Sequence, residues 1–357
     1  MRSIIKVLHT IETIGSGGVE RIRLSMAKLL DKQKFELKVI CTYENGEFAN
    51  QIRNEGIEVI EIGRLKHPFD WQTHKKVQKV IENYQPHIIH GAVFEGVTMA
   101  AINGFIKKVP IIILEETSDP QNRSWRGNLL MQFFSLTADK VIGVSSASTD
   151  YLTSKLKLPK RKVQLINNGV ALPRHVSEAE ILKLKCKYEM SEEEIIIGSI
   201  ARMNQDEHKR FSDLIKAFRI IVNKEIEAKL ILVGDGQELI NYKTLVNNLN
   251  IDDRVIFTGY QSDVAIYYSC FDIFSLVSAY EAFGLVLAEA MLHKLPVVAS
   301  KVGGMQFIVD DKETGFLIPR YNVDQIAEKL LILCRDKSLR KNMGDKGYLK
   351  AKREYTE

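Results

Sequence analysis

The chain has 357 residues, of which 45% are hydrophobic and 27% are charged, so it is long enough to bury two hydrophobic cores. Its four cysteines have neither metal-ligand nor disulfide spacing, which excludes a disulfide-stapled domain. No apolar run approaches the length of a membrane span. Because Lys6 interrupts the run that starts the chain, we expect a buried first strand there and not a signal peptide.

The N-terminal half alternates apolar, β-branched runs with stretches of helical periodicity, which predicts a parallel sheet covered by helices on both faces. A glycine-rich turn, Gly15-Ser16-Gly17-Gly18, follows the first strand and opens a helix over 19–30. It is a tight strand-to-helix turn, and its exposed N–H groups are also predicted to face a cleft between domains. Strands are expected at 4–10, 37–42, 57–62, 87–91, 111–115, 140–144 and 163–167.

A domain boundary is predicted after Val170, where a strand ends and a polar connection containing proline begins. The domains are then 1–170 and 171–357, and a hinge between them would suit closure over a ligand. The C-terminal half shows the same alternation as the N-terminal half. Its strands are expected at 195–201, 229–236, 255–260, 272–278, 295–300 and 315–319.

Two carboxylates in the C-terminal half, Glu281 and Glu289, stand eight positions apart around an uncharged run. On one helix this spacing would turn the second side chain about 80° from the first and move it roughly 12 Å along the axis, so one short ligand could touch both. Gly284 allows a close backbone approach, and the helix after it would point N–H groups at an anion such as a diphosphate. The alternative is an ordinary amphipathic helix whose glutamates face water.

The order of these motifs resembles family 4 of the retaining, nucleotide-sugar-dependent glycosyltransferases, which have the GT-B fold: α/β, with two Rossmann-like domains whose parallel sheets face each other across a cleft. The resemblance extends from the first glycine-rich turn to about residue 350, and the paired-glutamate block is its most specific part. The matching motifs are Gly17-Gly18-Val19-Glu20-Arg21, Asn168-Gly169-Val170, Arg202 with Lys209, Gly234-Asp235-Gly236, Glu281 to Glu289, Gly303-Gly304 and Thr314-Gly315-Phe316-Leu317.

The resemblance implies a catalytic role for two cations and a carboxylate. Arg202 and Lys209 would clamp the donor diphosphate and neutralise the leaving group. Glu281 would face the transferred sugar. Lys209 lies in a charged run that could simply be solvated, and the pair is spaced two residues wider than the family's commonest pattern, so Arg210 is a possible substitute.

Further positions are implied to bind the donor. Glu289 would accept hydrogen bonds from the ribose hydroxyls through its two oxygens. The backbone N–H groups of Phe283, Gly284 and Leu285 would bind phosphate or sugar oxygens. The remaining expected donor contacts are Gly234, Tyr260 in the loop around the nucleobase, and Gly17 and Gly18 beside the phosphate.

The chain departs from the family pattern at several positions. No histidine follows the strand at 111–114, and Glu116 is the expected replacement; the alternative is a carboxylate without a catalytic task. Phe307 stands where a glutamate usually follows the Gly303-Gly304 loop. His90 resembles a family position near the cleft, but a hydrogen-bonded core histidine is the safer expectation. The segment 350–357 coincides with the start of a family helix that crosses back to the first domain, so this helix is expected to be short or missing.

The net charge of +5 is unevenly divided, because residues 1–170 carry 24 Lys and Arg against 17 Asp and Glu. Two basic clusters lie beside aromatic residues, one from Arg64 to Lys79 and one around Trp125, and such a surface could rest on anionic lipid. The alternative is an ordinary charged face beside a helix that faces the core. Nucleic acid is not an expected partner, because the basic residues form no continuous stripe.

We therefore predict a cytoplasmic, retaining hexosyltransferase, and peripheral contact with the inner face of the membrane stays open. It would move a sugar from a UDP-linked donor to a glycan or polyprenyl-linked acceptor, in bacterial surface polysaccharide synthesis. The family resemblance implies no metal and no cofactor. Two other classes stay open: a nucleotide-sugar epimerase on the same fold, against which the paired-glutamate block argues, and a non-catalytic nucleotide-sugar-binding subunit.

Overall fold

The computed structural model describes residues 4–15, 17–118, 123–204 and 206–357. The chain divides into two compact units, Met1–Asn168 and Gly169–Glu357, called here the N-terminal and C-terminal units. The division lies just before the boundary expected after Val170, because Val170 pairs with Thr356 and so belongs to the C-terminal unit.

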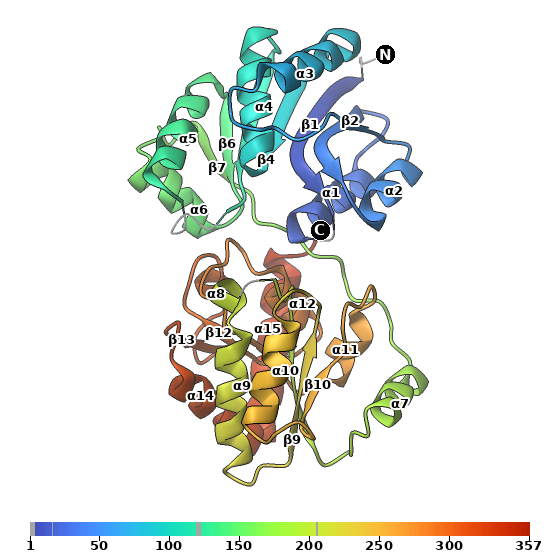
Figure 1. Ribbon diagram of the computed structural model, residues 1–357, viewed down its shortest axis with the longest axis vertical. Coiled ribbons are helices and arrows are strands. Elements are labelled where there is room, and N and C mark those ends of the chain that lie inside the picture. Colours follow the sequence, from blue (N-terminus) through green and yellow to red (C-terminus); the bar gives the residue numbers. More distant parts are fainter. Residues whose placement is uncertain (1–3, 16, 119–122, 205) are drawn as a thin grey trace. The chain divides into compact units, whose positions relative to one another are not determined.

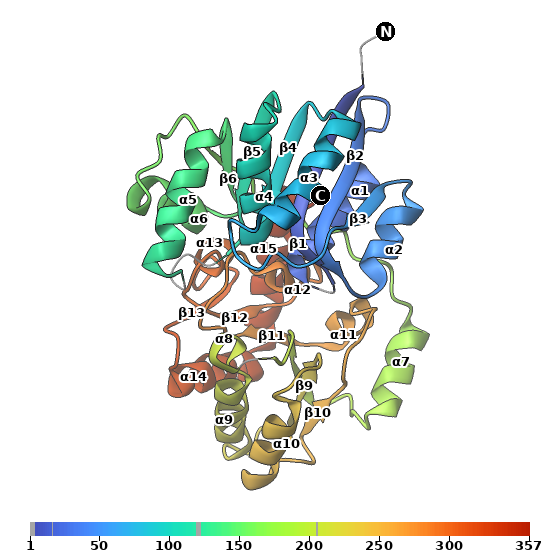
Figure 2. The ribbon, with the colours of Figure 1, turned by 45° about the horizontal axis from the view of Figure 1, so that its top comes forward.

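The N-terminal unit contains a seven-stranded sheet whose paired strands all run parallel, in the order β3-β2-β1-β4-β5-β6-β7. Figure 2 shows β2, β4, β5 and β6 following one another across this unit. The first strand is longer than expected because it stays paired with β2 as far as Ile14. The strands are β1 (Ile5–Ile14), β2 (Phe35–Glu44), β3 (Glu58–Glu61), β4 (Ile88–Ala92), β5 (Ile111–Glu116), β6 (Lys140–Gly143) and β7 (Val163–Leu165).

Helices cover both faces of this sheet (Figure 1). One core joins the sheet to α1 and α2, and the other joins it to α3, α4, α5 and η2, as the alternation of apolar runs predicts. The helices are α1 (Gly18–Leu29), α2 (Glu47–Asn54), α3 (Trp71–Tyr84), α4 (Val93–Ile106), α5 (Trp125–Thr137), α6 (Ser146–Asp150) and the π-helical turn η2 (Tyr151–Lys155).

The C-terminal unit repeats this plan with a six-stranded parallel sheet in the order β10-β9-β8-β11-β12-β13. The interiors of its central strands are fully buried, which fits their continuous Ile, Leu and Val runs. The strands are β8 (Ile195–Ile200), β9 (Ala228–Val233), β10 (Val255–Phe257), β11 (Ile273–Leu276), β12 (Val297–Ser300) and β13 (Gly315–Ile318).

The helices of the C-terminal unit also lie on both faces. One core includes α9, α10 and α14, which are drawn in front of the sheet or beside it in Figure 1, and the other includes α7, α11, α12 and α15. No described helix is both long and apolar enough to cross a membrane. The helices are α7 (Glu178–Lys187), α8 (Asp206–Lys209), α9 (Phe211–Val222), α10 (Leu239–Asn248), α11 (Ala265–Cys270), α12 (Leu285–Leu292), α13 (Met305–Ile308), α14 (Val323–Arg335) and α15 (Lys337–Glu354).

Both sheets are doubly wound: from the first strand of each unit, the chain adds strands first on one side and then on the other. β1 lies between β2 and β4, and β8 lies between β9 and β11. In open parallel sheets, the loops at the carboxyl ends of the strands on either side of such a reversal diverge and leave room for a ligand. The topology therefore selects the loops after β8 and β11 in the C-terminal unit.

Candidate functional site

The loops at the carboxyl edge of the C-terminal sheet are tied together by backbone hydrogen bonds. Met203 N–H donates to Asp235 O at 2.8 Å, which joins the loops after β8 and β9. Ala279 N–H donates to His208 O at 2.8 Å, which joins the loop after β11 to α8. Gly304 N–H donates to Glu281 O at 3.1 Å, adding the loop after β12. These loops form one connected surface, called here the carboxyl rim.

Two of the predicted catalytic side chains meet on the carboxyl rim. Lys209 Nζ donates to Glu281 Oε2 at 2.5 Å, although the two residues are 72 positions apart. The side chains are 27% and 19% exposed, so the pair is open to a ligand and yet partly desolvated. Lys209 is therefore not part of a merely solvated charge run: its ammonium group lies on the rim, against the carboxylate assigned to the sugar end.

The neighbouring arginines differ from each other. Arg202 follows β8, is exposed, and forms no ion pair with any residue that the structure describes. Arg210 instead donates two hydrogen bonds to Asp213, at 2.8 and 2.9 Å, and lies 3.3 Å from Asp206. Because Arg210 is held by two carboxylates of its own segment, Lys209 is the better placed of the two to meet a ligand anion.

The structure corrects one part of the paired-glutamate prediction. Glu281 and Glu289 do not share a helix, because α12 begins at Leu285 and Glu281 lies in the loop before it. The break comes at Gly284, whose φ of 104° is left-handed and open to glycine at little cost. The calculated angle and rise between the two side chains therefore do not apply. Gly284 nevertheless caps α12, whose first N–H groups have no partner within the helix.

Glu289 is half-buried on α12 and is held by a tyrosine that the sequence analysis did not identify. Tyr268 Oη, on α11, donates to Glu289 Oε2 at 2.8 Å. His293 stacks on the Tyr268 ring at 4.8 Å, and its Nδ1 lies 2.7 Å from Glu289 O. Burial lowers the pKa of His293, and a carbonyl only accepts, so the neutral imidazole carries its proton on Nδ1. The Glu289 carboxylate is thus oriented before any ligand arrives.

Glycines bring the other rim loops close together. A Cβ on Gly304 would lie 2.5 Å from Ala282 O, and one on Gly234 would lie 2.0 Å from Ala201 O. Only glycine fits at either place, so the two glycine motifs let the rim loops pack on each other. Gly234 pairs with Gly259, which puts the exposed Tyr260 at the same edge. The Phe283 side chain is buried against Tyr355, so only the backbone of Phe283 could contact a ligand.

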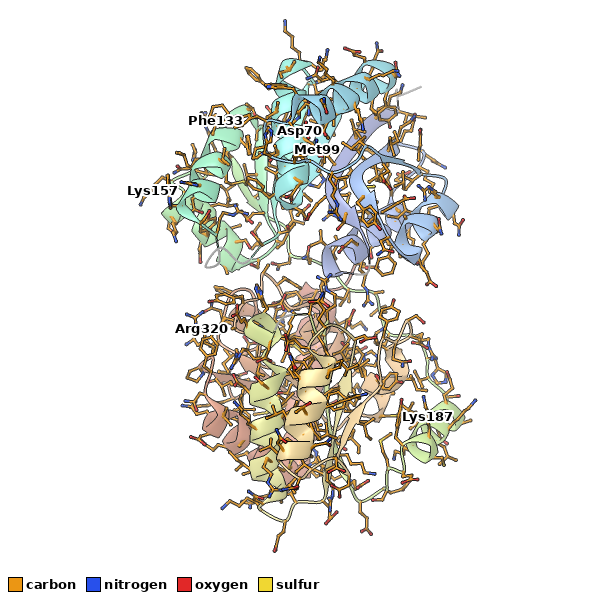
Figure 3. All side chains as sticks on the ribbon, viewed as in Figure 1. Asp70, Met99, Phe133, Lys157, Lys187 and Arg320 are labelled. Carbon is orange, nitrogen blue, oxygen red and sulfur yellow. The ribbon has the colours of Figure 1, made fainter. Side chains whose placement is uncertain are left out.

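A cluster of aromatic and cationic side chains adjoins the carboxyl rim, and sequence reasoning missed it. The Arg320 guanidinium lies over the rings of Tyr280 and Tyr321, at 5.4 Å from each centroid. Tyr280, next to Glu281 in the chain, also packs against His208 at 5.6 Å. Figure 3 shows Arg320 at the edge of the C-terminal unit. No motif marks these residues, because they come from helix α8 and from the loops after β11 and β13, which only folding brings together.

In the N-terminal unit, the carboxylate expected to replace the family histidine already has partners. Glu116 is buried at the end of β5 and accepts two hydrogen bonds from Arg123, at 2.5 and 2.8 Å. Ser118 Oγ donates a third at 2.6 Å. A role for Glu116 in sugar contact stays a prediction, and it would have to operate with Arg123 in place.

A second buried charge cluster lies between α1 and the sheet. Arg23 donates to Glu115 at 2.6 Å, and His90 Nε2 lies 3.0 Å from the same carboxylate. Burial alone would raise the pKa of Glu115, but the charge of Arg23 and the contact with His90 hold it at about 2. His9 packs edge-on against His90 at 4.8 Å and finds no hydrogen-bond partner among the described residues. His90 is thus a buried residue, and its close neighbour is the Glu115 carboxylate.

The glycine-rich turn after β1 is described at Gly15, Gly17 and Gly18, while Ser16 lies outside the described residues. Gly17 is the N-cap of α1, and a Cβ there would lie 2.3 Å from Glu20 Oε2. Val93, after β4, has a φ of 62°, which is strained for a β-branched residue. Both features lie at the reversal point of the N-terminal sheet, the place that corresponds to the carboxyl rim.

Two family profiles match the chain one after the other. The profile described as Glycosyltransferase Family 4 matches residues 16–174, and the one described as Glycosyl transferases group 1 matches residues 181–350. Together they span nearly all of both units. The chain belongs to glycosyltransferase family 4 and has the GT-B fold.

Individual relatives agree with the family. N-acetyl-alpha-D-glucosaminyl L-malate synthase of Bacillus anthracis is 36% identical over 219 residues, which are 61% of this chain and 56% of the relative's length. Capsular polysaccharide biosynthesis glycosyltransferase CapM of Staphylococcus aureus is 24% identical over 98% of this chain and 93% of the relative's length. The crystal structure of Anabaena HepE in complex with UDP superposes with a TM-score of 0.86 at 21% identity, covering 99% of this chain and 96% of that one.

Proposed function

We propose that the protein is a retaining glycosyltransferase that moves a hexose from a UDP-linked donor to a glycan or lipid-linked acceptor in bacterial surface polysaccharide synthesis. The observation that carries the proposal is the arrangement of Arg202, Lys209, Glu281 and Glu289 around the reversal point of the C-terminal sheet. Two cations and two oriented carboxylates there suit a ligand with a diphosphate flanked by two polyols.

In the proposed reaction, the bond between the anomeric carbon and the diphosphate oxygen breaks while the acceptor oxygen attacks from the same face. Arg202 and Lys209 stabilise the negative charge that develops on the leaving diphosphate. The leaving phosphate oxygen takes the proton of the acceptor hydroxyl. Because the acceptor oxygen attacks the anomeric carbon directly, no protein nucleophile forms a covalent intermediate. Glu281 would meet the transferred sugar, and Glu289 the ribose.

The proposal includes no bound metal and no cofactor, since the two cations would take the place of an ion. Turnover should therefore persist in EDTA, and the product should keep the anomeric configuration of the donor, which nuclear magnetic resonance can read. The names of the relatives support the donor and acceptor classes: UDP is bound in the HepE structure, and CapM is named for capsular polysaccharide.

The assay should also test a small acid as acceptor, because one relative is named for L-malate. A panel should therefore contain polyprenyl-linked sugars, oligosaccharides and L-malate. Conversion of the donor without any acceptor would instead indicate an epimerase, and donor binding without turnover would indicate a binding subunit. A cytoplasmic location, with contact to the inner face of the membrane, is part of the same proposal.

The diphosphate clamp is tested by Arg202→Ala and Lys209→Ala. Each change should lower turnover by roughly two to three orders of magnitude, because each removes a stabiliser of the leaving group worth on the order of 3 kcal/mol. The thermal midpoint should stay close to that of the wild type, since both side chains lie at the surface of the rim.

Arg210→Ala serves as the control, because it should cost stability through the loss of its contacts with Asp213 and Asp206. Near-wild-type rates for both clamp variants would refute the assignment. Loss of turnover only in the Arg210 variant would assign the diphosphate contact to Arg210 and not to Lys209.

A further inference from the structure

Helix α5 carries an apolar stripe on its outer face. Trp125, Leu129, Phe133 and Leu136 are 70%, 59%, 54% and 74% exposed. At 3.6 residues per turn their side chains fall within an arc of about 80°. The opposite side of the helix, with Met131 and Phe134, is buried in the core of the N-terminal unit. A helix that is apolar on both sides is unusual at the surface of a protein in water.

The end of α4 lies beside the end of α5 and also carries exposed apolar side chains. Thr137 Oγ1, at the last turn of α5, lies 3.4 Å from Ala101 O on α4. One turn further along α4, Phe105 and Ile106 are 66% and 44% exposed. The ends of α4 and α5 therefore lie side by side, and the exposed apolar side chains of both ends, together with the stripe, are called here the α5 patch.

Basic side chains border the α5 patch. The Arg126 guanidinium lies 5.3 Å from the Trp125 ring, and Lys162 Nζ donates to Leu136 O at 3.2 Å. Gln132 donates to Leu156 O at 3.0 Å, which brings the exposed Lys155 and Lys157 beside the helix. Figure 3 shows Phe133 and Lys157 at the same outer edge of the N-terminal unit.

The charge balance of this region is one-sided. Residues 123–165 contain eight Lys or Arg against two Asp, and α5 itself has neither Asp nor Glu. A protein partner would need an apolar surface with an acidic rim to match it. An anionic bilayer offers both properties at once, because its headgroups are negative and its acyl chains lie just beneath them.

We propose that the α5 patch is the surface through which this protein binds anionic lipid bilayers, with Trp125, Leu129, Phe133 and Leu136 entering the headgroup region. This specifies the membrane contact in the proposed function. Of the two basic clusters in the N-terminal half, it selects the one around Trp125, because four apolar side chains share a face there. The test below needs no turnover, so it can fail while the transferase proposal stands.

The experiment is sedimentation of the full chain with mixed phosphatidylcholine–phosphatidylglycerol vesicles and with pure phosphatidylcholine vesicles. The wild type should pellet with the mixed vesicles at low salt and be released as salt screens the attraction. Leu129→Ser with Leu136→Ser should lower binding at least tenfold. The matched control is Leu182→Ser with Ile240→Ser in the C-terminal unit, whose side chains are 59% and 74% exposed, and it should bind as the wild type does.

A charge arm uses Lys155→Gln with Lys157→Gln, which should weaken binding about fivefold for each charge removed. Its control is Lys183→Gln with Lys187→Gln on α7. Equal losses in the variants and their controls, or equal binding to both kinds of vesicle, would overturn the proposal. So would a wild-type dimer that the Leu129 and Leu136 changes dissociate, because the occupant would then be a second copy of the chain.

Discussion

The two carboxylates of the paired-glutamate block are held by different kinds of partner. Glu281 is paired with a cation, Lys209, whereas Glu289 accepts from a neutral hydroxyl, that of Tyr268. A cation can leave its carboxylate for a phosphate, and a buried tyrosine stays in place. The first pair can therefore rearrange when a diphosphate binds, while the second presents a fixed acceptor.

This difference predicts different defects for the two carboxamide variants. Glu289→Gln should weaken binding of UDP by roughly 1–3 kcal/mol, because a charge-assisted hydrogen bond to the ribose is lost. Glu281→Gln should leave UDP binding near normal and lower turnover of the intact donor, because the proposed function places Glu281 against the reacting sugar and not against the nucleotide. Calorimetry with UDP and initial-rate kinetics measure the two effects.

Tyr268→Phe is the matched control for orientation, since it removes the hydroxyl that positions Glu289 and keeps its charge. It should weaken UDP binding less than Glu289→Gln does and in the same direction. If both carboxamide variants bind and turn over like the wild type, the two glutamates do not contact the donor, and the proposed function loses its main support.

At the scale of elements, the packing of α1 on β1, β4 and β5 buries four titratable groups. His9 has its pKa well below 6.5 because of burial and of the neighbouring Arg23 and His90. Glu115 has its pKa near 2. Both folded-state values lie below the unfolded ones, so the unfolded chain binds more protons, and acid favours unfolding. His9 contributes to the loss of folding stability below about pH 6.5, and Glu115 contributes to it only below about pH 4.5.

His9→Leu should therefore flatten the stability profile between about pH 7 and pH 5, by up to roughly 1.4 kcal/mol per pH unit for the one proton involved. Both tryptophans, Trp71 and Trp125, lie in the N-terminal unit, so their fluorescence during urea unfolding reports on this unit. Parallel profiles for wild type and variant would show that His9 does not carry the acid sensitivity.

At the scale of the whole molecule, each unit has its own sheet and its own cores on both faces. Nearly all predicted donor contacts lie in the C-terminal unit, and only Gly17 and Gly18 lie in the other. Gly169–Glu357 also includes the strand-like pairing of Val170 with Thr356, which closes the ends of this unit on each other.

Residues 169–357 expressed alone should therefore fold and bind UDP within about tenfold of the full chain, because the rim and its hydrogen bonds are complete within this unit. They should not turn over donor, since the family resemblance assigns acceptor binding to the N-terminal domain. Circular dichroism checks folding and calorimetry checks binding. A folded fragment that does not bind UDP would place essential donor contacts in the N-terminal unit.

Local patterns in the sequence determined much of this protein. Buried parallel strands read as continuous Ile, Leu and Val runs, so both sheets and their helices could be predicted, with errors confined to element ends such as the extension of β1 to Ile14. Glycine motifs marked the rim loops for a similar reason, since Gly234 and Gly304 leave no room for a side chain. Structural features that depend on residues close together in the chain could thus be predicted from the sequence.

Only the tertiary structure decided how distant side chains pair. It gave Lys209 and Arg210 different carboxylate partners and placed the start of α12 after Glu281. It also paired Tyr268 with Glu289 and Arg123 with Glu116. Such contacts depend on the order of the strands and the path of the loops, and neither leaves a periodic signal in the chain. The outward stripe of α5 looks like a core helix in the sequence for the same reason: exposure is a property of what packs around a residue and not of the residue itself.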